Sequence, residues 1–172
     1  VFGAVLSGNA VFFMDGYDRA MKISSKGYPG LDVSEAETEK VLRGSKEGFC
    51  DSVKTNAALV RKRIRDTLLK VEQQNIGVRS NTVVQLLYVE DLVHEELLIA
   101  VKERLESFTV DGILDSGMLE QLTEEAWYSP FPQFQTTERP DRAAQELLSG
   151  KAVLLCDNSP VALVIPGAFN SF

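Results

Sequence analysis

The sequence predicts an α/β fold, with α+β-like layering of helices on mixed sheets, organised as two related α/β subdomains. Two observations favour it. A stretch near the start recurs near the end, and helical and strand patterns alternate between the copies. The chain has 172 residues, 44% of them hydrophobic, and can bury a core. We expect residues 1–66 to hold the remainder of the first subdomain, incomplete at its N-terminus, with a connecting segment. We expect residues 67–172 to form the second subdomain.

The repeat relates residues 7–23 to residues 149–165 at a constant offset of 142. Across positions 6 to 20, seven of fifteen residues are identical: Leu6/Leu148, Ser7/Ser149, Gly8/Gly150, Ala10/Ala152, Val11/Val153, Asp15/Asp157 and Ala20/Ala162. Each copy predicts a β-hairpin, with strands at 10–15 and 19–23 and at 152–156 and 161–165. The repeat indicates that a helix–hairpin unit closes each subdomain. The alternative is that Ser-Gly before a hairpin recurs by chance.

A helix is expected before each hairpin. The second copy is preceded by "PDRAAQELLSG", and Gly150 is a typical residue to end a helix there. The residues predicted to share its buried face are Ala143, Ala144, Leu147 and Leu148. The first copy has only "VFGAVLSG" at this place, which is typical of the tail of a similar helix.

The middle of the chain alternates between helical and strand patterns. Residues 25–46 are polar and turn-rich, with a short helical piece near 37–42. Apolar residues at helical spacing predict helices at 50–65 and 94–108. Strands are expected at 68–76 and 82–89, the second a continuous apolar run typical of a buried strand. The remaining predicted elements are a strand at 110–114, a helix at 116–125 and an aromatic, proline-rich loop.

Composition excludes several classes of function. Lysine and arginine total 18 against 25 acidic residues, so the net charge of −7 argues against nucleic acid or anionic lipid as a partner. No run of 18 apolar residues occurs, so residues 1–172 are not expected to span a membrane. Cys50 and Cys156 are expected to be free thiols, with a disulfide as the alternative.

Catalytic, metal and cofactor sites are not predicted. His94 is the single histidine, and no HxxxH motif or Cys/His cluster surrounds it. The sequence has neither the GxxxxGK[ST] nor the GxGxxG motif of nucleotide-binding proteins. The acidic stretch "LDVSEAETE" lacks the ligand pattern of a calcium loop. We expect a protein that is not an enzyme and needs no cofactor.

Two polar clusters remain as candidate sites. In the cluster at residues 137–141, Thr137 is predicted to cap the helix that follows, and Pro140 is predicted to occupy the first turn of that helix. Arginines close to carboxylates form hydrogen-bonded networks that fix loops, so the clusters are either structural or part of an interface with another domain or subunit. The first cluster comprises Arg43, Glu47, Thr55, Asn56, Arg61 and Arg63, and the second Thr137, Glu138, Arg139 and Asp141.

Six motifs run in order along the chain: "RGSKEGF" (43–49), "TNAALVRKR" (55–63), "IGVRSNT" (76–82), "VDGILDSGMLEQL" (110–122), "SPFPQFQTTERPD" (129–141) and "SPVALVIP" (159–166). In these motifs the chain resembles the GerA family, the A subunits of spore germinant receptors in Bacillus and Clostridium. Relative to the family pattern, Ser45 replaces a usual proline, Val78 and Asn81 replace basic residues, and Asp157-Asn158 stands where Asp-Gly is common. These departures weaken the case that the missing basic side chains serve a shared site.

The resemblance implies a non-enzymatic domain of a multi-pass protein of the spore inner membrane. Its partners would be the B and C subunits and other A subunits, and its membrane segments would lie outside these residues. The family responds to nutrients by opening an ion path, so this domain would serve assembly and signal coupling. We expect it to be soluble, on the cytoplasmic or spore-core side. The resemblance also implies two similar α/β subdomains.

Two alternatives remain open. One is a small-molecule module with a ligand between the subdomains, since such clefts often bind ligands. The other is the soluble domain of a relative of the stage V sporulation protein AF group.

Overall fold

The computed structural model describes residues 1–25, 47–107 and 134–166. The predicted helical pieces at 37–42 and 116–125, the strand at 110–114 and the candidate site residue Arg43 lie outside these residues. In chain order the elements are α1 (Phe2–Leu6), β1 (Asn9–Phe13), β2 (Ala20–Ser24), α2 (Val53–Arg63), β3 (Leu69–Ile76), β4 (Thr82–Val89), α3 (Glu95–Glu106), β5 (Gln135–Thr137), α5 (Pro140–Leu148), β6 (Ala152–Cys156) and β7 (Ala162–Ile165).

The described strands form two sheets. The larger has the order β3-β4-β6-β7-β5, and the smaller is the hairpin β1-β2. The α/β fold class is confirmed, but the sheets are not mixed, because every strand pairing among the described residues is antiparallel. The connections explain the difference, since β3-β4 and β6-β7 are hairpins, which reverse the chain.

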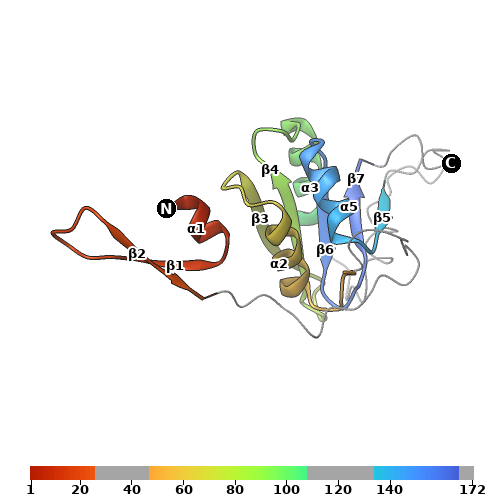
Figure 1. The fold of residues 1–172 in the computed structure, drawn as a ribbon. Coiled ribbons are helices and arrows are strands. Elements are labelled where there is room, and N and C mark those ends of the chain that lie inside the picture. The colour runs from red at the N-terminus through yellow and green to blue at the C-terminus, as the bar shows by residue number, and fades with distance from the viewer. Residues whose placement is uncertain (26–46, 108–133, 167–172) are drawn as a thin grey trace, which may run out of the picture.

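Helices cover both faces of the larger sheet (Figure 1). On one face, α2 and α5 pack in one hydrophobic cluster with residues of β4 and β6 such as Leu87 and Val153. On the other face, Val101 and Leu105 of α3 pack with Leu154 and neighbouring residues. The sheet is therefore the middle layer of a three-layer unit, and β6 and β7 are buried along their whole length.

Helix α2 belongs to the core of this unit. Its predicted apolar stripe is buried, with Val53 and Val60 at most 2% exposed. The Oγ atom of Ser52 accepts a hydrogen bond from the N–H of Thr55 at 3.4 Å and so caps the helix. Phe49, just before the helix, is also buried in the same cluster. The predicted boundary at residue 66 does not follow this packing, because it separates α2 from the sheet on which the helix packs.

The helix–hairpin unit forms in both copies, as the repeat predicts. In the second copy Ala143, Ala144 and Leu147 of α5 are buried as expected, whereas Leu148 is 56% exposed and was wrongly placed on the buried face. In the first copy α1 precedes the β1-β2 hairpin, which extends away from the larger sheet (Figure 1). Within the described residues, no helix is both long and apolar enough to cross a membrane.

Candidate functional site

Glu47 of the first predicted cluster joins the chain before α2 to the last turn of that helix. Its carboxylate lies 2.7 Å from Nζ of Lys62 and 2.7 Å from Nη2 of Arg63. Nη1 of Arg63 also donates to the carbonyl of Leu59 at 3.0 Å. The hydrogen bond from Lys62 is the largest effect on the pKa of Glu47 and lowers it. Burial, the next largest, raises the pKa, but the hydrogen bond from Arg63 and the charges of both cations keep it lowered overall. The structure therefore brings together Glu47 and Arg63 of the first cluster, and Lys62 is an additional partner.

The buried side chain of Asn56 fixes the segment of chain that leads into α2. The residue is 1% exposed. Its Oδ1 accepts from the N–H of Cys50 at 2.9 Å, and its Nδ2 donates to the carbonyl of Cys50 at 2.6 Å. Asn56 thus satisfies buried backbone groups and is not available to another subunit. Thr55, one residue earlier, is half-buried and contributes its backbone N–H to the cap of α2.

The second cluster forms the turn into α5. Pro140 occupies the first turn of the helix, as predicted, but the N-cap is Arg139 and carries no side-chain capping bond. Thr137 was expected to cap α5. It lies two residues before the N-cap, so its Oγ1 accepts instead from the N–H of Arg139 at 3.1 Å. Nε and Nη2 of Arg139 each donate to one carboxylate oxygen of Asp141, and the Nε bond measures 3.1 Å.

The Arg139–Asp141 pair is bidentate and half-buried, with side-chain exposures of 17% and 29%. Burial raises the pKa of Asp141, but the hydrogen bonds and charge of Arg139, with local backbone N–H groups, outweigh it and lower the pKa overall. A bidentate arginine–carboxylate pair fixes both side chains in one orientation. The pair therefore holds the first turn of α5 in a defined shape.

The two clusters meet through the backbone. The N–H of Phe49 donates to the carbonyl of Glu138 at 2.8 Å, although the residues are far apart in sequence. Close by, Oδ1 of Asp157 accepts from the N–H of Val53 at 3.1 Å, and the N–H of Asn158 donates to the carbonyl of Asp51 at 2.7 Å. We call the residues 47–53, 137–141 and 157–158 the α2 clasp. They fix α2 to the start of α5 and to the β6–β7 turn.

Asp157 is part of the α2 clasp, but the sequence did not indicate it as a candidate site residue. The signal was present, because Asp157 is one of the identities of the internal repeat. Asn158 has a φ of +63°, in the left-handed region that glycine and asparagine adopt most easily. This explains why the matching position of the first repeat copy is a glycine, Gly16. The turn conformation and the bond to α2 together position this end of the β6–β7 hairpin.

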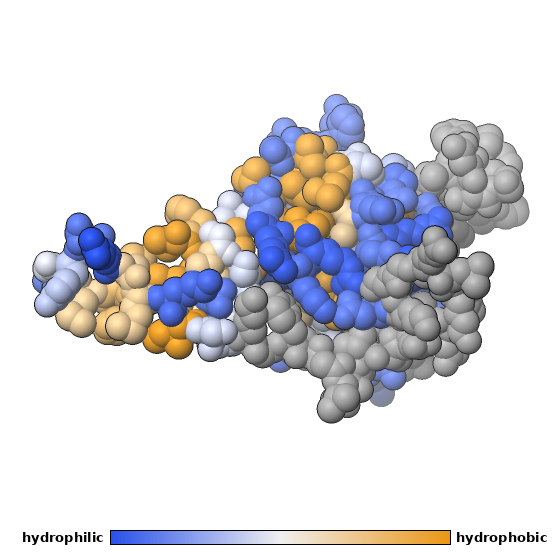
Figure 2. Space-filling view, in the orientation of Figure 1, coloured by the Kyte–Doolittle hydropathy of each residue, from blue (hydrophilic) through white to orange (hydrophobic). Residues whose placement is uncertain are grey.

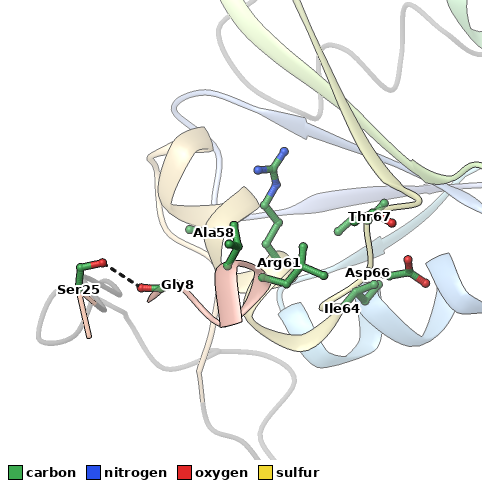
Figure 3. A pocket seen from close by; sticks show the side chains of 10 residues that line it. Gly8, Ser25, Ala58, Arg61, Ile64, Asp66 and Thr67 are labelled. Atoms are coloured by element: carbon green, nitrogen blue, oxygen red, sulfur yellow. Dashed lines mark hydrogen bonds between the residues drawn. The ribbon is translucent and has the colours of Figure 1, made fainter. Parts of the chain in front are cut away.

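Arg61 lies apart from the α2 clasp. It is exposed and lines a cavity of about 550 Å³ between the N-terminal unit and the start of the larger one. Figure 3 shows that the guanidinium of Arg61 and the carboxylate of Asp66 point in different directions. Polar groups do not converge here as they do in most ligand sites. The cavity is lined by Val5, Leu6, Gly8, Ser25, Ala58, Arg61, Ile64, Asp66, Thr67 and Leu69.

A further polar cluster, which the sequence did not indicate, holds α3 on the opposite face of the sheet. Glu72 of β3 accepts from Nζ of Lys102 at 2.8 Å and from the hydroxyl of Tyr88. Nζ of Lys102 also lies 5.5 Å from the centroid of the Tyr88 ring. Burial, followed by the hydrogen bond to Glu72, raises the pKa of Tyr88 to about 12. Lys102 and Tyr88, in that order, lower the pKa of Glu72.

Potential metal ligands do not cluster in the described part of the chain. In residues 1–25, 47–107 and 134–166, no group of three or more His, Cys, Asp or Glu side chains could hold a metal ion. His94 is the N-cap of α3 and makes no side-chain capping bond. Cys50 and Cys156 are both free thiols, as expected.

Comparisons with known proteins give one consistent result. The family model described as "Bacillus/Clostridium GerA spore germination protein" matches residues 1–172. "Uncharacterized membrane protein YfkQ" of Bacillus subtilis is 38% identical over 98% of this chain and 33% of its own length. "Spore germination protein KA" of the same organism is 37% identical over 100% of this chain and 32% of its own length. The chain thus spans about a third of the length of these relatives.

A solved structure is also similar. The N-terminal domain of the A subunit of the Bacillus megaterium spore germinant receptor GerK3 has a TM-score of 0.70 and 31% sequence identity to this chain. The match covers 99% of this chain and 60% of that one.

Proposed function

Because the chain belongs to the GerA family of spore germination proteins, we propose that it is the soluble N-terminal part of a germinant receptor A subunit. The observation that carries this proposal is the similarity of nearly the whole chain to the N-terminal domain of such a subunit, in sequence and in fold. On this proposal the domain is not an enzyme. It acts in receptor assembly and in coupling the nutrient signal during germination.

The proposal extends to partners and location. The B and C subunits of the same receptor and further A subunits would contact this domain. The full-length protein would lie in the spore inner membrane, held by segments outside residues 1–172, with this domain on the cytoplasmic or spore-core side. The similarity to a protein described as a membrane protein supports a membrane location for the full-length protein.

The α2 clasp supports a coupling role, because a domain that transmits a signal between subunits must move as one body. Backbone and side-chain bonds in the clasp join residues that are far apart in sequence, such as Phe49 with Glu138 and Val53 with Asp157, which are 104 positions apart. Among the candidate residues, Asn56 and Thr137 are buried and fix the clasp. Glu138, Arg139 and Asp141 are half-buried, and we propose that their exposed parts link α5 to a neighbouring subunit.

The first test is genetic and uses the full-length protein in spores. Deletion of the gene should abolish or slow germination with at least one nutrient, measured as loss of optical density and release of dipicolinate. Germination through non-nutrient triggers should be unchanged. If the deletion strain responds normally to every nutrient tested, including amino acid and sugar mixtures, the receptor proposal is wrong.

The second test concerns the coupling role of Arg139. Arg139→Ala should slow nutrient-triggered germination while the level of the protein in spore membranes stays unchanged on immunoblots. Arg142→Ala, an exposed arginine in the first turns of the same helix, is the matched control and should germinate normally. A fall in protein level that parallels the germination defect would assign Arg139 a purely structural role.

The two alternatives from the sequence are not favoured. A solute-binding module needs converging polar groups, and the cavity near Arg61 is lined mainly by apolar side chains. The similarity to stage V sporulation protein AF shows that both proteins share a family. The receptor reading is favoured because the similar solved structure is that of a receptor A subunit.

A further inference from the structure

The outer face of α3 carries a stripe of acidic side chains with apolar side chains among them. Residues three or four positions apart lie on the same side of a helix. Leu92, just before the helix, is 43% exposed and Ile99 is 49% exposed, so both apolar side chains meet water. The residues of this stripe, which we call the acidic α3 face, are all exposed: Leu92, Glu95, Glu96, Ile99, Glu103 and Glu106.

The basic side chains of α3 are used toward the body of the protein. Nζ of Lys102 lies 2.8 Å from the carboxylate of Glu72 and 5.5 Å from the centroid of the Tyr88 ring. Arg104 is half-buried, and its Nε atom is buried. On an ordinary exposed helix, lysines placed four residues from glutamates pair with them. The acidic α3 face instead presents four carboxylates and no cation of its own helix.

This arrangement destabilises the last turn of α3. The C-terminal end of a helix carries a partial negative charge, so carboxylates are unfavourable there. Glu103 and Glu106 both lie in this turn, and at a spacing of three residues they also repel each other. Glu95 and Glu96 lie in the first turn, where the helix favours acidic side chains. A cationic group bound at Glu103 and Glu106 would remove the unfavourable term, whereas water does so only in part.

The start of α3 lies at the end of the larger sheet toward which β4 and β7 both run (Figure 1), since β6 is antiparallel to each of them. Ile165, the last residue of β7, pairs with Ala152, the first residue of β6. Gly150, just before β6, lies against Leu92, because a Cβ atom on Gly150 would be 2.7 Å from the Leu92 carbonyl oxygen. Figure 2 shows apolar residues among hydrophilic ones at this end. The chain that follows β7 therefore starts beside the acidic α3 face.

Charge and chain length together identify the occupant. An acidic surface is repelled by anionic lipid, so a protein segment is favoured over the membrane surface. Membrane proteins carry an excess of lysine and arginine in their cytoplasmic loops. This chain covers only 33% and 32% of the length of the two Bacillus subtilis relatives, and one of them is described as a membrane protein. The similar GerK3 structure is an N-terminal domain, so the rest of such a protein follows it.

We propose that the acidic α3 face binds a lysine- and arginine-rich loop of the membrane part that follows this domain in the same chain. Cations of the loop pair with Glu103 and Glu106, and an apolar side chain of the loop packs on Ile99. Since Lys102 joins α3 to Glu72 of the sheet, the loop and the sheet hold opposite sides of one helix. The inference rests on the proposed function, which places a membrane part after this domain.

Photo-cross-linking in the full-length protein, purified alone in a neutral detergent, tests the occupant. With p-benzoylphenylalanine in place of Ile99, mass spectrometry should locate the cross-link in a basic loop after residue 172. The same amino acid in place of Gln145, exposed on α5 on the opposite side of the sheet, is the matched control and should not reach that loop. Mixing ¹⁴N- and ¹⁵N-labelled protein should give only unmixed pairs. Mixed pairs, which indicate a second copy, overturn the proposal, as does the absence of any cross-link to residues after 172.

Charge reversal tests whether the carboxylates hold the loop. Glu103→Lys combined with Glu106→Lys should lower the yield of the cross-link from position 99 about tenfold, because two attractions become repulsions. Lysine suits the last turn of a helix, so loss of folding is not expected to cause the effect. Asp15→Lys combined with Asp18→Lys makes the same change in net charge at exposed positions of the N-terminal hairpin and should alter the yield less than about twofold. Equal yields from both double variants would refute the proposal. Neither measurement uses germination, so its failure is distinguishable from failure of the receptor function.

Discussion

Replacement of Gly150 by alanine provides the most sensitive test of the packing between α5 and the chain after β4. Gly150 has a φ of +91°, and a Cβ atom at this position would lie 2.7 Å from the carbonyl oxygen of Leu92. The left-handed backbone costs alanine about 1–2 kcal/mol. Overlap with a backbone atom adds about 1–3 kcal/mol, as in overpacked cores. Leu92 is restrained, because its N–H donates to the carbonyl of Val89 at 3.1 Å.

We therefore expect Gly150→Ala to lower the free energy of unfolding by roughly 2–5 kcal/mol. Urea unfolding followed by far-UV circular dichroism measures it. Asn158→Ala is the control, because Asn158 shares the left-handed backbone but already carries a Cβ atom, and the expected loss is about 1 kcal/mol or less. If both variants lose the same stability, the contact with Leu92 contributes nothing and the reasoning is refuted.

Three further predictions use the same assay. The pKa values of Glu47 and Glu72 are lowered from 4.5 in the folded protein. Their contributions to stability are therefore complete above pH 4.5 and are lost as the pH falls through the folded-state pKa values. Equal free energies of unfolding at pH 6.5 and at pH 3 would contradict this. Asn56→Ala should cost about 1–3 kcal/mol, because two buried backbone groups lose their partners; an unchanged urea midpoint would count against it. Leu147→Ala should cost about 2–5 kcal/mol and Leu148→Ala less than about 0.5 kcal/mol, since one side chain is 0% exposed and its neighbour 56%; a reversed order would show that the orientation of α5 is wrong.

Local patterns predicted most of the elements. The continuous apolar run at 82–89 coincides with β4, and the periodic apolar residues near 53–64 and 97–105 lie on the buried sides of α2 and α3. These patterns succeed because they report which side of an element meets the core. The repeat likewise predicted both hairpins, since turn residues and alternating apolar residues are local signals.

Long-range arrangement was not predictable in the same way. The sequence reports that β4 and β6 are buried but not that they run antiparallel, because the direction depends on the path of the connection between them. The bond between Asp157 and Val53 joins residues 104 positions apart, which no local pattern reports. The placement of Thr137 was a local error, since Pro140 in the first helical position already makes Arg139 the N-cap.

The bond from Asp157 to the start of α2 also has a consequence for biosynthesis. Chains grow at about 5–20 residues per second, so α2 leaves the ribosome roughly 5–20 s before its distant acceptor is made. The helix has 11 residues, a length that is marginal in isolation. Strand β6, which α2 also contacts, is made equally late. Folding of this unit is therefore expected to be completed only near the end of its translation.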